Sequence, residues 1–400
     1  PIVKDGLLSD KDNSRYTDYI NNFSIRYNDF KFNISKELYN KSFYYPYYYN
    51  SYPQNKDGET LISSKPMRYD FSLSLKSSIV NHLFLFGMQY ARETYQSYDV
   101  FSKDGTEILN PSIFSDNKER VINETSFFIT DQFKIFNGET VLGLRATKYF
   151  CYNWNFIPSI SLRYEFYGQN LRFNYSRGYR VPSLKELYYN FPEHPMQPLY
   201  GNPDLRPSMS DYYAISIESI KSLNSSIEIY INNVIDMISP ISTSNNTMEY
   251  SNTQKVSLYG LNINFDIPLY DKVTIKSVLS YTNGDSNDRE LIEGISRYSF
   301  NTRLKYNISS KSNLLFTTKY NSSKNVFVYS NNSSGYFYKL DSYSISDILL
   351  SYKLGKISIK GGIKNIFDYL SPSRNNNQAG ENLSTIDPGR RIYFSMNFSI

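Results

Sequence analysis

Two histidines supply the only imidazole side chains of the chain, and one of them stands where it could bind a ligand. His194 lies in a stretch with Pro192, Pro195 and Pro198 around it, a composition typical of a long loop. A neutral imidazole nitrogen is a good axial ligand for iron. The alternative is a loop histidine that binds nothing. The second histidine, His82, is expected beside a short turn and facing solvent.

Tyrosine and arginine side chains add to this candidate chemistry. Residues 43–52 form the densest aromatic cluster of the chain and include Tyr47 and Tyr48. Tyrosine rings stack on a porphyrin or a sugar, and a phenolate can bind ferric iron. The alternative is an aromatic girdle at a membrane interface. Arg180 and Arg206, which stand on either side of His194 in the sequence, could attract an anionic ligand, although such charges also line the wet interior of a barrel.

The other reactive residue types exclude several classes of protein. There is no glycine-rich phosphate loop and no pair of histidines at metal-binding spacing, so the sequence predicts no enzyme. The single Cys151 excludes an intrachain disulfide and a metal site made of cysteines alone. The 43 basic and 38 acidic residues are interspersed and give a net charge of +5, which does not indicate nucleic-acid binding.

The elements that must carry these residues are strands. The mean hydropathy is -0.50, and 40 Tyr and 26 Phe accompany many Ile, Ser and Asn, a mixture that favours strands and turns. No run approaches about 18 consecutive apolar residues, so no transmembrane helix is predicted. Residues 1–9 have neither the basic start nor the apolar stretch of a signal peptide.

Apolar and polar residues alternate with a period of two along most of the chain. In residues 68–76, 170–176, 226–232, 261–267 and 392–400, one face is apolar and the other polar. Both a soluble β-sandwich and a membrane barrel have such strands. Segments such as 81–96 and 335–352 are longer than the roughly 5–6 residues typical of soluble strands, which favours the barrel.

The connections between these strands alternate in length. Short turns are expected at 28–29, 137–138, 168–169 and 354–355, and long polar or aromatic stretches fall between them, at 41–65, 97–117, 181–207, 284–294 and 371–385. Short turns on one side and long loops on the other are typical of outer-membrane barrels. About 17 strands are expected, with residues 1–15 in an external loop. Because bacterial single-chain barrels have even strand numbers, the odd count predicts that N-terminal strands are missing, about five of a total of 22.

Four stretches carry recurring combinations of residues. They are 175–188 (YSRGYRVPSLKELY); 201–207 (GNPDLRP); 232–238 with 250–252 and 259–261 (NNVIDMI, YSN, YGL); and 362–368 with 388–390 (GIKNIFD, PGR). Pro182 marks a strand that leaves its sheet, because proline cannot donate to a ladder. Asn202 and Asp204 signal a turn, and Asn365 and Asp368 could cap the turn at a strand end. These residues are expected to shape loops rather than to contact a ligand.

Taken in this order, the four stretches resemble TonB-dependent outer-membrane receptors. The resemblance covers roughly half of the chain and departs from the family pattern at Val181, Ser208 and Ile400. It implies an all-β fold, a transmembrane antiparallel β-barrel of the 22-strand type. Residues 1–400 would form one partial barrel in the cell outer membrane, without the plug domain and the first strands.

The resemblance also implies a function. It predicts energised import of a scarce iron-containing nutrient, with haem slightly ahead of a ferric siderophore, through contacts with the TonB–ExbB–ExbD complex made by a plug domain. Haem receptors of the family carry a histidine between the first two stretches, so His194 is the candidate axial ligand of haem iron. The resemblance predicts no intrinsic cofactor. Cobalamin or another large solute is the alternative cargo, and a non-transporting barrel remnant or adhesin is the alternative class.

Overall fold

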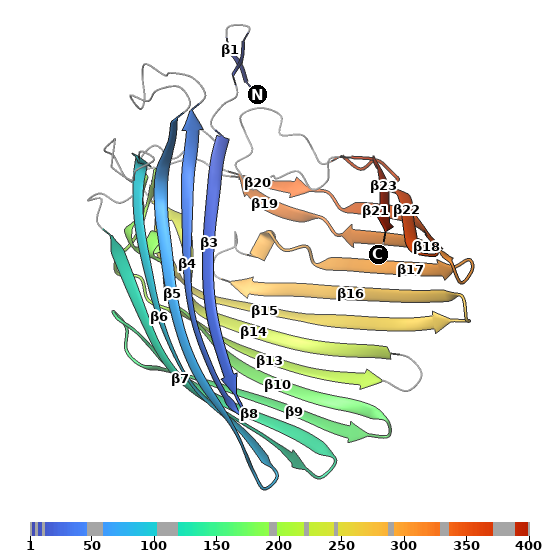
Figure 1. Ribbon diagram of the computed structural model, residues 1–400, viewed down its shortest axis with the longest axis horizontal. Coiled ribbons are helices and arrows are strands. Elements are labelled where there is room, and N and C mark those ends of the chain that lie inside the picture. Colours follow the sequence, from blue (N-terminus) through green and yellow to red (C-terminus); the bar gives the residue numbers. More distant parts are fainter. Residues whose placement is uncertain are drawn as a thin grey trace.

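The computed structural model describes residues 2–4, 7–9, 13–45, 59–101, 119–191, 198–219, 224–243, 247–286, 292–328, 336–370 and 389–398. Nearly all of the regular structure in these ranges is antiparallel β-sheet, which curves round as one wall (Figure 1). Among these residues, no helix is long and apolar enough to cross a membrane. The prediction of an all-β antiparallel barrel is confirmed.

Seventeen strands of the described chain form the wall, which agrees with the expected number. They are β3 (Asn13–Tyr27), β4 (Phe30–Tyr45), β5 (Glu59–Ile79), β6 (His82–Phe101), β7 (Arg120–Ile135), β8 (Gly138–Tyr149), β9 (Asn155–Phe166), β10 (Gln169–Arg180), β13 (Ser208–Ser219), β14 (Asn224–Ser242), β15 (Met248–Leu269), β16 (Val273–Ser286), β17 (Tyr298–Asn307), β18 (Ser312–Asn321), β21 (Tyr343–Leu354), β22 (Ile357–Lys364) and β23 (Arg391–Phe398).

Smaller elements stand beside the wall. They are the hairpin of β1 (Ile2–Lys4) and β2 (Leu7–Ser9), the short helix α1 (Leu184–Tyr188), the strand pair β11 (Asn190–Phe191) and β12 (Leu199–Tyr200), and the hairpin of β19 (Lys324–Val328) and β20 (Tyr336–Leu340). β12 also pairs in parallel with the outer part of β15.

Each wall strand pairs antiparallel with the next wall strand along the chain. The strand order is that of a closed barrel with β23 and β3 as neighbours. Residue registers run from β3–β4 to β22–β23, and in the described part of the chain none joins β23 to β3. The expected absence of further N-terminal strands stays a prediction.

The two faces of the wall differ as the alternation predicted. On β14, Ile227, Ile229 and Ile231 are 52%, 64% and 39% exposed, and large exposed apolar side chains recur on the same face of other strands. The other face carries rungs of side-chain hydrogen bonds, such as Asn262 Nδ2 to Glu228 Oε1 at 3.1 Å. In a membrane barrel the apolar face meets lipid and the polar face lines the lumen.

Tight turns join β3 to β4, β5 to β6, β7 to β8, β9 to β10 and β21 to β22, all at one end of the barrel, which we call the short-turn end. Three turns lie one residue away from the positions expected from sequence. Gly138, for instance, pairs with Ile135, so the turn residues are Phe136 and Asn137. The register of the flanking strands decides this, and it places bulky residues at positive φ, 51° at Phe136 and 47° at Tyr167.

One expected strand is wrong. Residues 335–352 do not form a single strand, because β20 ends at Leu340 and β21 begins at Tyr343. The β18–β21 ladder ends at the same height, with Asn321 opposite Tyr343. Ser322 still pairs with β17, since its N–H donates to Tyr298 O at 2.8 Å and its Oγ accepts from Tyr298 N at 3.0 Å. The hairpin β19–β20 is therefore a separate two-stranded sheet at the long-loop end.

The outward apolar face predicts a mutational asymmetry. Replacing Ile229 by Arg places a charge on the lipid face and is expected to cost about 2–4 kcal/mol of unfolding free energy if the site lies near the bilayer midplane. Guanidinium unfolding of the chain folded into lipid vesicles measures this. Glu228→Arg, on the lumen face one residue away, is the matched control and is expected to cost under about 1 kcal/mol. Equal losses would contradict the assignment of the faces.

Candidate functional site

The first two sequence stretches meet at the long-loop end of the barrel. β10 ends at Arg180, Pro182 is fully buried, and Ser183 begins helix α1. A capping box fixes the N-terminus of the helix. Glu186 N donates to Ser183 Oγ at 3.2 Å, and Ser183 N donates to Glu186 Oε2 at 2.8 Å. Both first-turn donors are thereby satisfied, so the chain leaves the wall in one fixed direction.

Apolar side chains anchor this helix. Leu184 and Leu187 are 2% and 3% exposed, and Leu187 packs in one cluster with Leu205 and Ile238. At Gly201 an added Cβ would lie 2.4 Å from Tyr189 N. The glycine therefore allows the turn of the second stretch to lie directly against the backbone that follows α1.

Polar contacts join the second stretch to the third. Asn252 accepts from Arg206 N at 2.8 Å and donates through Nδ2 to the carbonyl oxygens of Arg206 and Asp236, both at 2.8 Å. Ser208 Oγ also donates to Asp236 O at 2.7 Å. Asp204 N donates to Asn202 Oδ1 at 2.9 Å, which confirms the expected turn. We call residues 180–187, 202–208, Asp236 and Asn252 the rim cluster.

A tyrosine on the connection between β8 and β9 is hydrogen-bonded to the rim cluster. Tyr152 Oη donates to Leu205 O at 2.9 Å. Burial, the largest cause, raises the pKa of Tyr152 above its ordinary value, and neighbouring groups add to the effect. The phenol therefore keeps its proton, and with it the bond to Leu205, to a higher pH than an ordinary tyrosine would.

The fourth stretch forms a comparable buried turn. Asn365 is fully buried at a φ of 51°; its N–H donates to Asp347 Oδ1 at 2.8 Å, and its side chain bonds both N and O of Tyr369 at 2.9 and 2.7 Å. Asp368 Oδ1 accepts from Arg390 N at 2.7 Å. The expected capping role of Asn365 and Asp368 is confirmed.

The sequence-predicted ligand residues have different outcomes. His194, Tyr47 and Tyr48 lie outside the described residues, so their roles stay predictions. Arg180 is ion-paired with Glu186, whose side chain is 11% exposed, and Arg206 is ion-paired with Asp236 at 2.6 Å. Their charges are thus partly neutralised within the rim cluster. Sequence reasoning did not find these acidic partners, although both stand inside the motif stretches.

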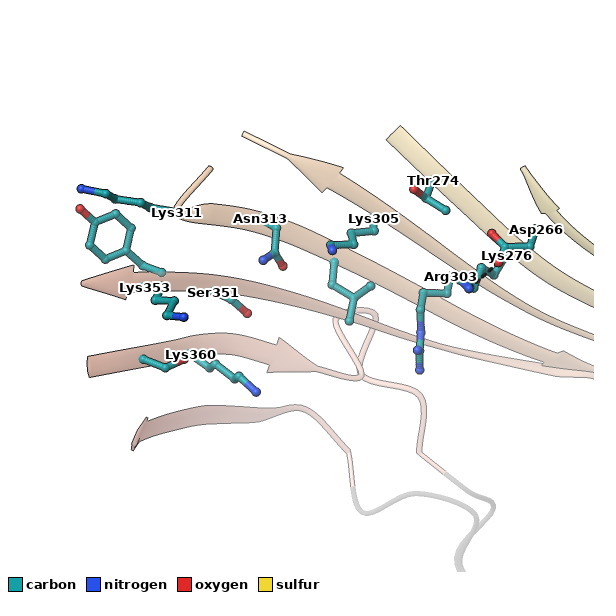
Figure 2. Close-up of a pocket in the computed structure, with 13 residues that line it drawn as sticks. Asp266, Thr274, Lys276, Arg303, Lys305, Lys311, Asn313, Ser351, Lys353 and Lys360 are labelled. Atoms are coloured by element: carbon teal, nitrogen blue, oxygen red, sulfur yellow. Dashed lines mark hydrogen bonds and ion pairs between the residues drawn. The ribbon is translucent and has the colours of Figure 1, made fainter. Parts of the chain in front are cut away.

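The lumen wall carries two further groups of charged residues. The first lies at the short-turn end on β16, β17, β21, β22 and the turn before β18, and it lines a hollow of about 640 Å³ (Figure 2). We call its cationic side chains the basic strip, and one carboxylate, Asp266, lies among them. The strip consists of Lys276, Arg303, Lys305, Lys311, Lys353 and Lys360.

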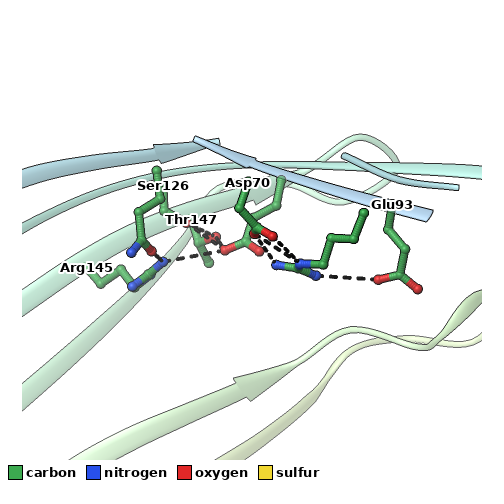
Figure 3. Close-up of polar contacts among 8 residues, drawn as sticks. Asp70, Glu93, Ser126, Arg145 and Thr147 are labelled. Carbon is green, nitrogen blue, oxygen red and sulfur yellow. Dashed lines mark hydrogen bonds and ion pairs between the residues drawn. The ribbon is translucent and has the colours of Figure 1, made fainter. Parts of the chain in front are cut away.

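The second group is a network of mixed charge on β5 to β8 (Figure 3). Arg68 bonds Asp70 at 2.8 Å and Glu93 at 3.5 Å. Glu124 accepts from Ser126 Oγ at 2.8 Å and lies 3.6 Å from Arg145. Each of the two arginines is ion-paired within this network, which holds three carboxylates, so it stiffens the wall and offers no free cation to an anionic ligand. In the described ranges there is no group of three or more His, Cys, Asp or Glu that could hold a metal ion.

A continuous antiparallel wall with an apolar outer face, a polar lumen and long loops at one end defines a transmembrane β-barrel of the outer-membrane class. Residues 4–366 match the family described as TonB dependent receptor-like, beta-barrel. The chain therefore belongs to the TonB-dependent receptor family, whose barrels lie in the bacterial outer membrane.

Several solved and curated receptors are similar to this chain. The siderophore receptor PirA from Acinetobacter baumannii matches with a TM-score of 0.75 and 16% identity over 97% of this chain. A mutant of the ferric enterobactin receptor PfeA from Pseudomonas aeruginosa, in complex with enterobactin, matches with a TM-score of 0.74 and 18% identity over 96% of this chain. The ferric enterobactin receptor PirA of Pseudomonas aeruginosa is 25% identical over 177 residues, or 41% of this chain.

The chain is shorter than these relatives. It covers 63% and 62% of the two solved receptor chains, and the match to the curated PirA covers 23% of that protein.

The rim cluster predicts a local stability effect. Asn252→Ala removes three hydrogen bonds and leaves the carbonyl of Asp236 with one donor fewer, so it is expected to cost about 1–3 kcal/mol. Denaturant unfolding measures the loss, and limited proteolysis between residues 181 and 207 should become faster. Asn283→Ala, which removes one bond to Tyr259 Oη, is the control. Equal proteolysis rates in the two variants would show that Asn252 does not hold the rim together.

Proposed function

We propose that this chain forms the barrel wall and external loops of a receptor that imports a ferric siderophore. Energy would come from the TonB–ExbB–ExbD complex, acting on a plug domain outside these 400 residues. The chain itself would contribute the lumen and the rim on which the loops stand, without chemical catalysis and without an intrinsic cofactor.

The observation that carries this proposal is the likeness to siderophore receptors over nearly the whole chain, together with the rim cluster. The relatives' names give ferric enterobactin as ligand for PfeA and for the Pseudomonas aeruginosa PirA. The rim cluster supports the same proposal because it holds rigid the base of the loop between Arg180 and Arg206. Binding residues on loops need such a scaffold.

A catecholate siderophore is the cargo class that we put first. Three catecholate dianions around Fe³⁺ give a complex with three negative charges, which suits the cationic side chains of a polar lumen. From the sequence, His194 placed haem slightly ahead of a ferric siderophore as the expected cargo. None of the named relatives is a haem receptor, so the ferric siderophore now takes first place and axial ligation by His194 remains a hypothesis.

The test is uptake by cells that make the full-length receptor containing this chain. In a strain without its own ferric enterobactin receptor, radioactive iron supplied as ferric enterobactin should enter the cells, and a TonB-deficient strain should take up at least about tenfold less. His194→Ala should leave this uptake unchanged, because a tris-catecholate iron has no free coordination position for imidazole.

Haem supplied as sole iron source is the contrasting arm. Growth on haem, a loss of that growth in His194→Ala, and no uptake of ferric enterobactin would move the assignment to haem. Uptake of neither iron source by wild type would point to another solute or to a barrel that does not transport.

A further inference from the structure

Two cations on the outer face of the wall stand behind the charged network of β5 to β8. Arg92 directly precedes Glu93 on β6, and Lys148 directly follows Thr147 on β8. Glu93 and Thr147 belong to the network on the lumen side (Figure 3). Successive side chains of a strand point to opposite faces, so Arg92 and Lys148 face outward, towards lipid.

A third outward cation joins them. Lys36 on β4 lies opposite Tyr69 on β5, and Tyr69 lies opposite Arg92 on β6. The ammonium group of Lys36 lies 5.3 Å from the centroid of the Tyr69 ring, a cation–π contact. We call Lys36, Arg92 and Lys148 the outer cation patch. Neighbouring strands are about 4.8 Å apart, so cations on every second strand are spaced by at least about 10 Å.

The patch lies at the upper edge of the apolar band. Arg92 is ten residues beyond His82, the first residue of β6, and Lys148 is ten residues beyond Gly138, the first residue of β8. At about 3.3 Å per residue and a tilt of about 40°, this corresponds to a rise of about 25 Å, the height of the apolar band of such barrels. Long loops mark the external side of an outer-membrane barrel. The patch is therefore level with the headgroups of the outer leaflet.

The cations of the patch have no acidic partner in the part of the chain that the structure describes. All three are exposed, and neither Arg92 nor Lys148 forms an ion pair or a side-chain hydrogen bond there. Between the short turns and this level, the one outward acid described on β4 to β8 is Asp131, which pairs with His82 at 2.9 Å near the short-turn end. The counterion of the patch must therefore come from outside the wall.

Cations are not spread evenly round the outer face. On β16, β17, β18, β21, β22 and β23, the described residues include none on that face. Arg177 on β10 is neutralised by Asp211 at 2.9 Å. The remaining outward cations of the described wall strands, Arg15, Lys65 and Lys255, lie 12 to 14 residues beyond the short turns, above the level of the patch. A general interfacial ring would carry cations on all sides, so the patch on β4 to β8 is a local feature.

Charge and position together indicate an anionic lipid headgroup. Guanidinium and ammonium groups both bind phosphate. Asn123, opposite Arg92, adds a donor, because its Oδ1 accepts from Tyr90 Oη at 3.3 Å and its Nδ2 is left to donate. A spacing of about 10 Å is too wide for one phosphate group, so a headgroup with two phosphates fits the patch better.

We infer that the outer cation patch binds the phosphate groups of a multiply phosphorylated lipid of the outer leaflet, whose acyl chains lie along the apolar strands below. Each cation near a membrane surface contributes modestly to such binding, so several act together. The outer face is separate from the lumen, so lipid binding here does not depend on the proposed function.

Trp154 provides a local reporter. It is the single tryptophan of the chain, and its ring centroid lies 6.0 Å from that of the outward-facing Phe127. Asn155 pairs with Thr147, so Trp154 lies across from Lys148 on the neighbouring strand. A lipid with brominated acyl chains that binds at the patch should therefore quench the fluorescence of Trp154.

The test uses the full chain folded in mixed micelles of phosphatidylcholine and detergent, with brominated lipid A, which carries two phosphates, as the probe. Half-maximal quenching should need roughly tenfold less lipid A than of the same lipid with its phosphates removed. Arg92→Gln with Lys148→Gln should reduce this preference to about threefold or less. Lys31→Gln with Lys76→Gln is the matched control, because it removes the same charge from the lumen side of β4 and β5.

The control pair should keep the preference within about twofold of wild type. Equal quenching of wild type by the two lipids, or an equal loss in the two double variants, would overturn the lipid site. Relief of quenching by soluble pyrophosphate at constant ionic strength would show that the patch binds a free anion, which would overturn it as well. Circular dichroism checks that the variants are folded. Lys148→Gln alone, which changes one exposed side chain, should lose about threefold and decides the matter if the double variant does not fold.

Discussion

The need to satisfy every backbone N–H and C=O group in hydrocarbon governs this structure. Water cannot solvate these groups inside a bilayer, so a spanning sheet must pair each strand with its neighbours along its whole length. The long registers between successive wall strands meet this need, with β14 and β15 paired from Asn224–Asp266 to Ser242–Met248. The alternation of side chains follows from it, because a paired strand presents one face to lipid and the other to the lumen.

The same need explains why the loops begin from buried polar clusters. Where a strand leaves the ladder, its backbone groups lose their partners and need others. The capping box at Ser183 and Glu186, the bonds of Asn252 and the buried turn at Asn365 provide them. Several residues of the family motifs therefore bond backbone groups, and Arg180 and Arg206 are held by Glu186 and Asp236 of the same cluster. The motifs build the base from which the connections at the long-loop end begin.

Charge is distributed unevenly along the lumen. On β5 to β8 the two arginines lie among three carboxylates, and Arg68 and Arg145 are both ion-paired. On β16 to β22 the cations face water together, with Asp266 as the acid that pairs Lys276. A barrel wall tolerates both patterns because the lumen is wet, and high dielectric weakens the repulsion among exposed like charges.

The sequence by itself determined the class of the fold, since alternation such as that of Ile227, Ile229 and Ile231 and the spacing of turns follow directly from strand geometry. It also located the turn at Asn202 and the caps at Asn365 and Asp368, because Asn and Asp bond backbone close to them in the chain. The tertiary structure decided what depends on residues far apart. Register moved the turn to Phe136, and the expected strand at 335–352 is interrupted between Leu340 and Tyr343, where the β18–β21 ladder ends. The pairing of Arg206 with Asp236, and the gathering of lysines from four strands and one turn into one strip, arise only when the sheet forms and brings distant segments together.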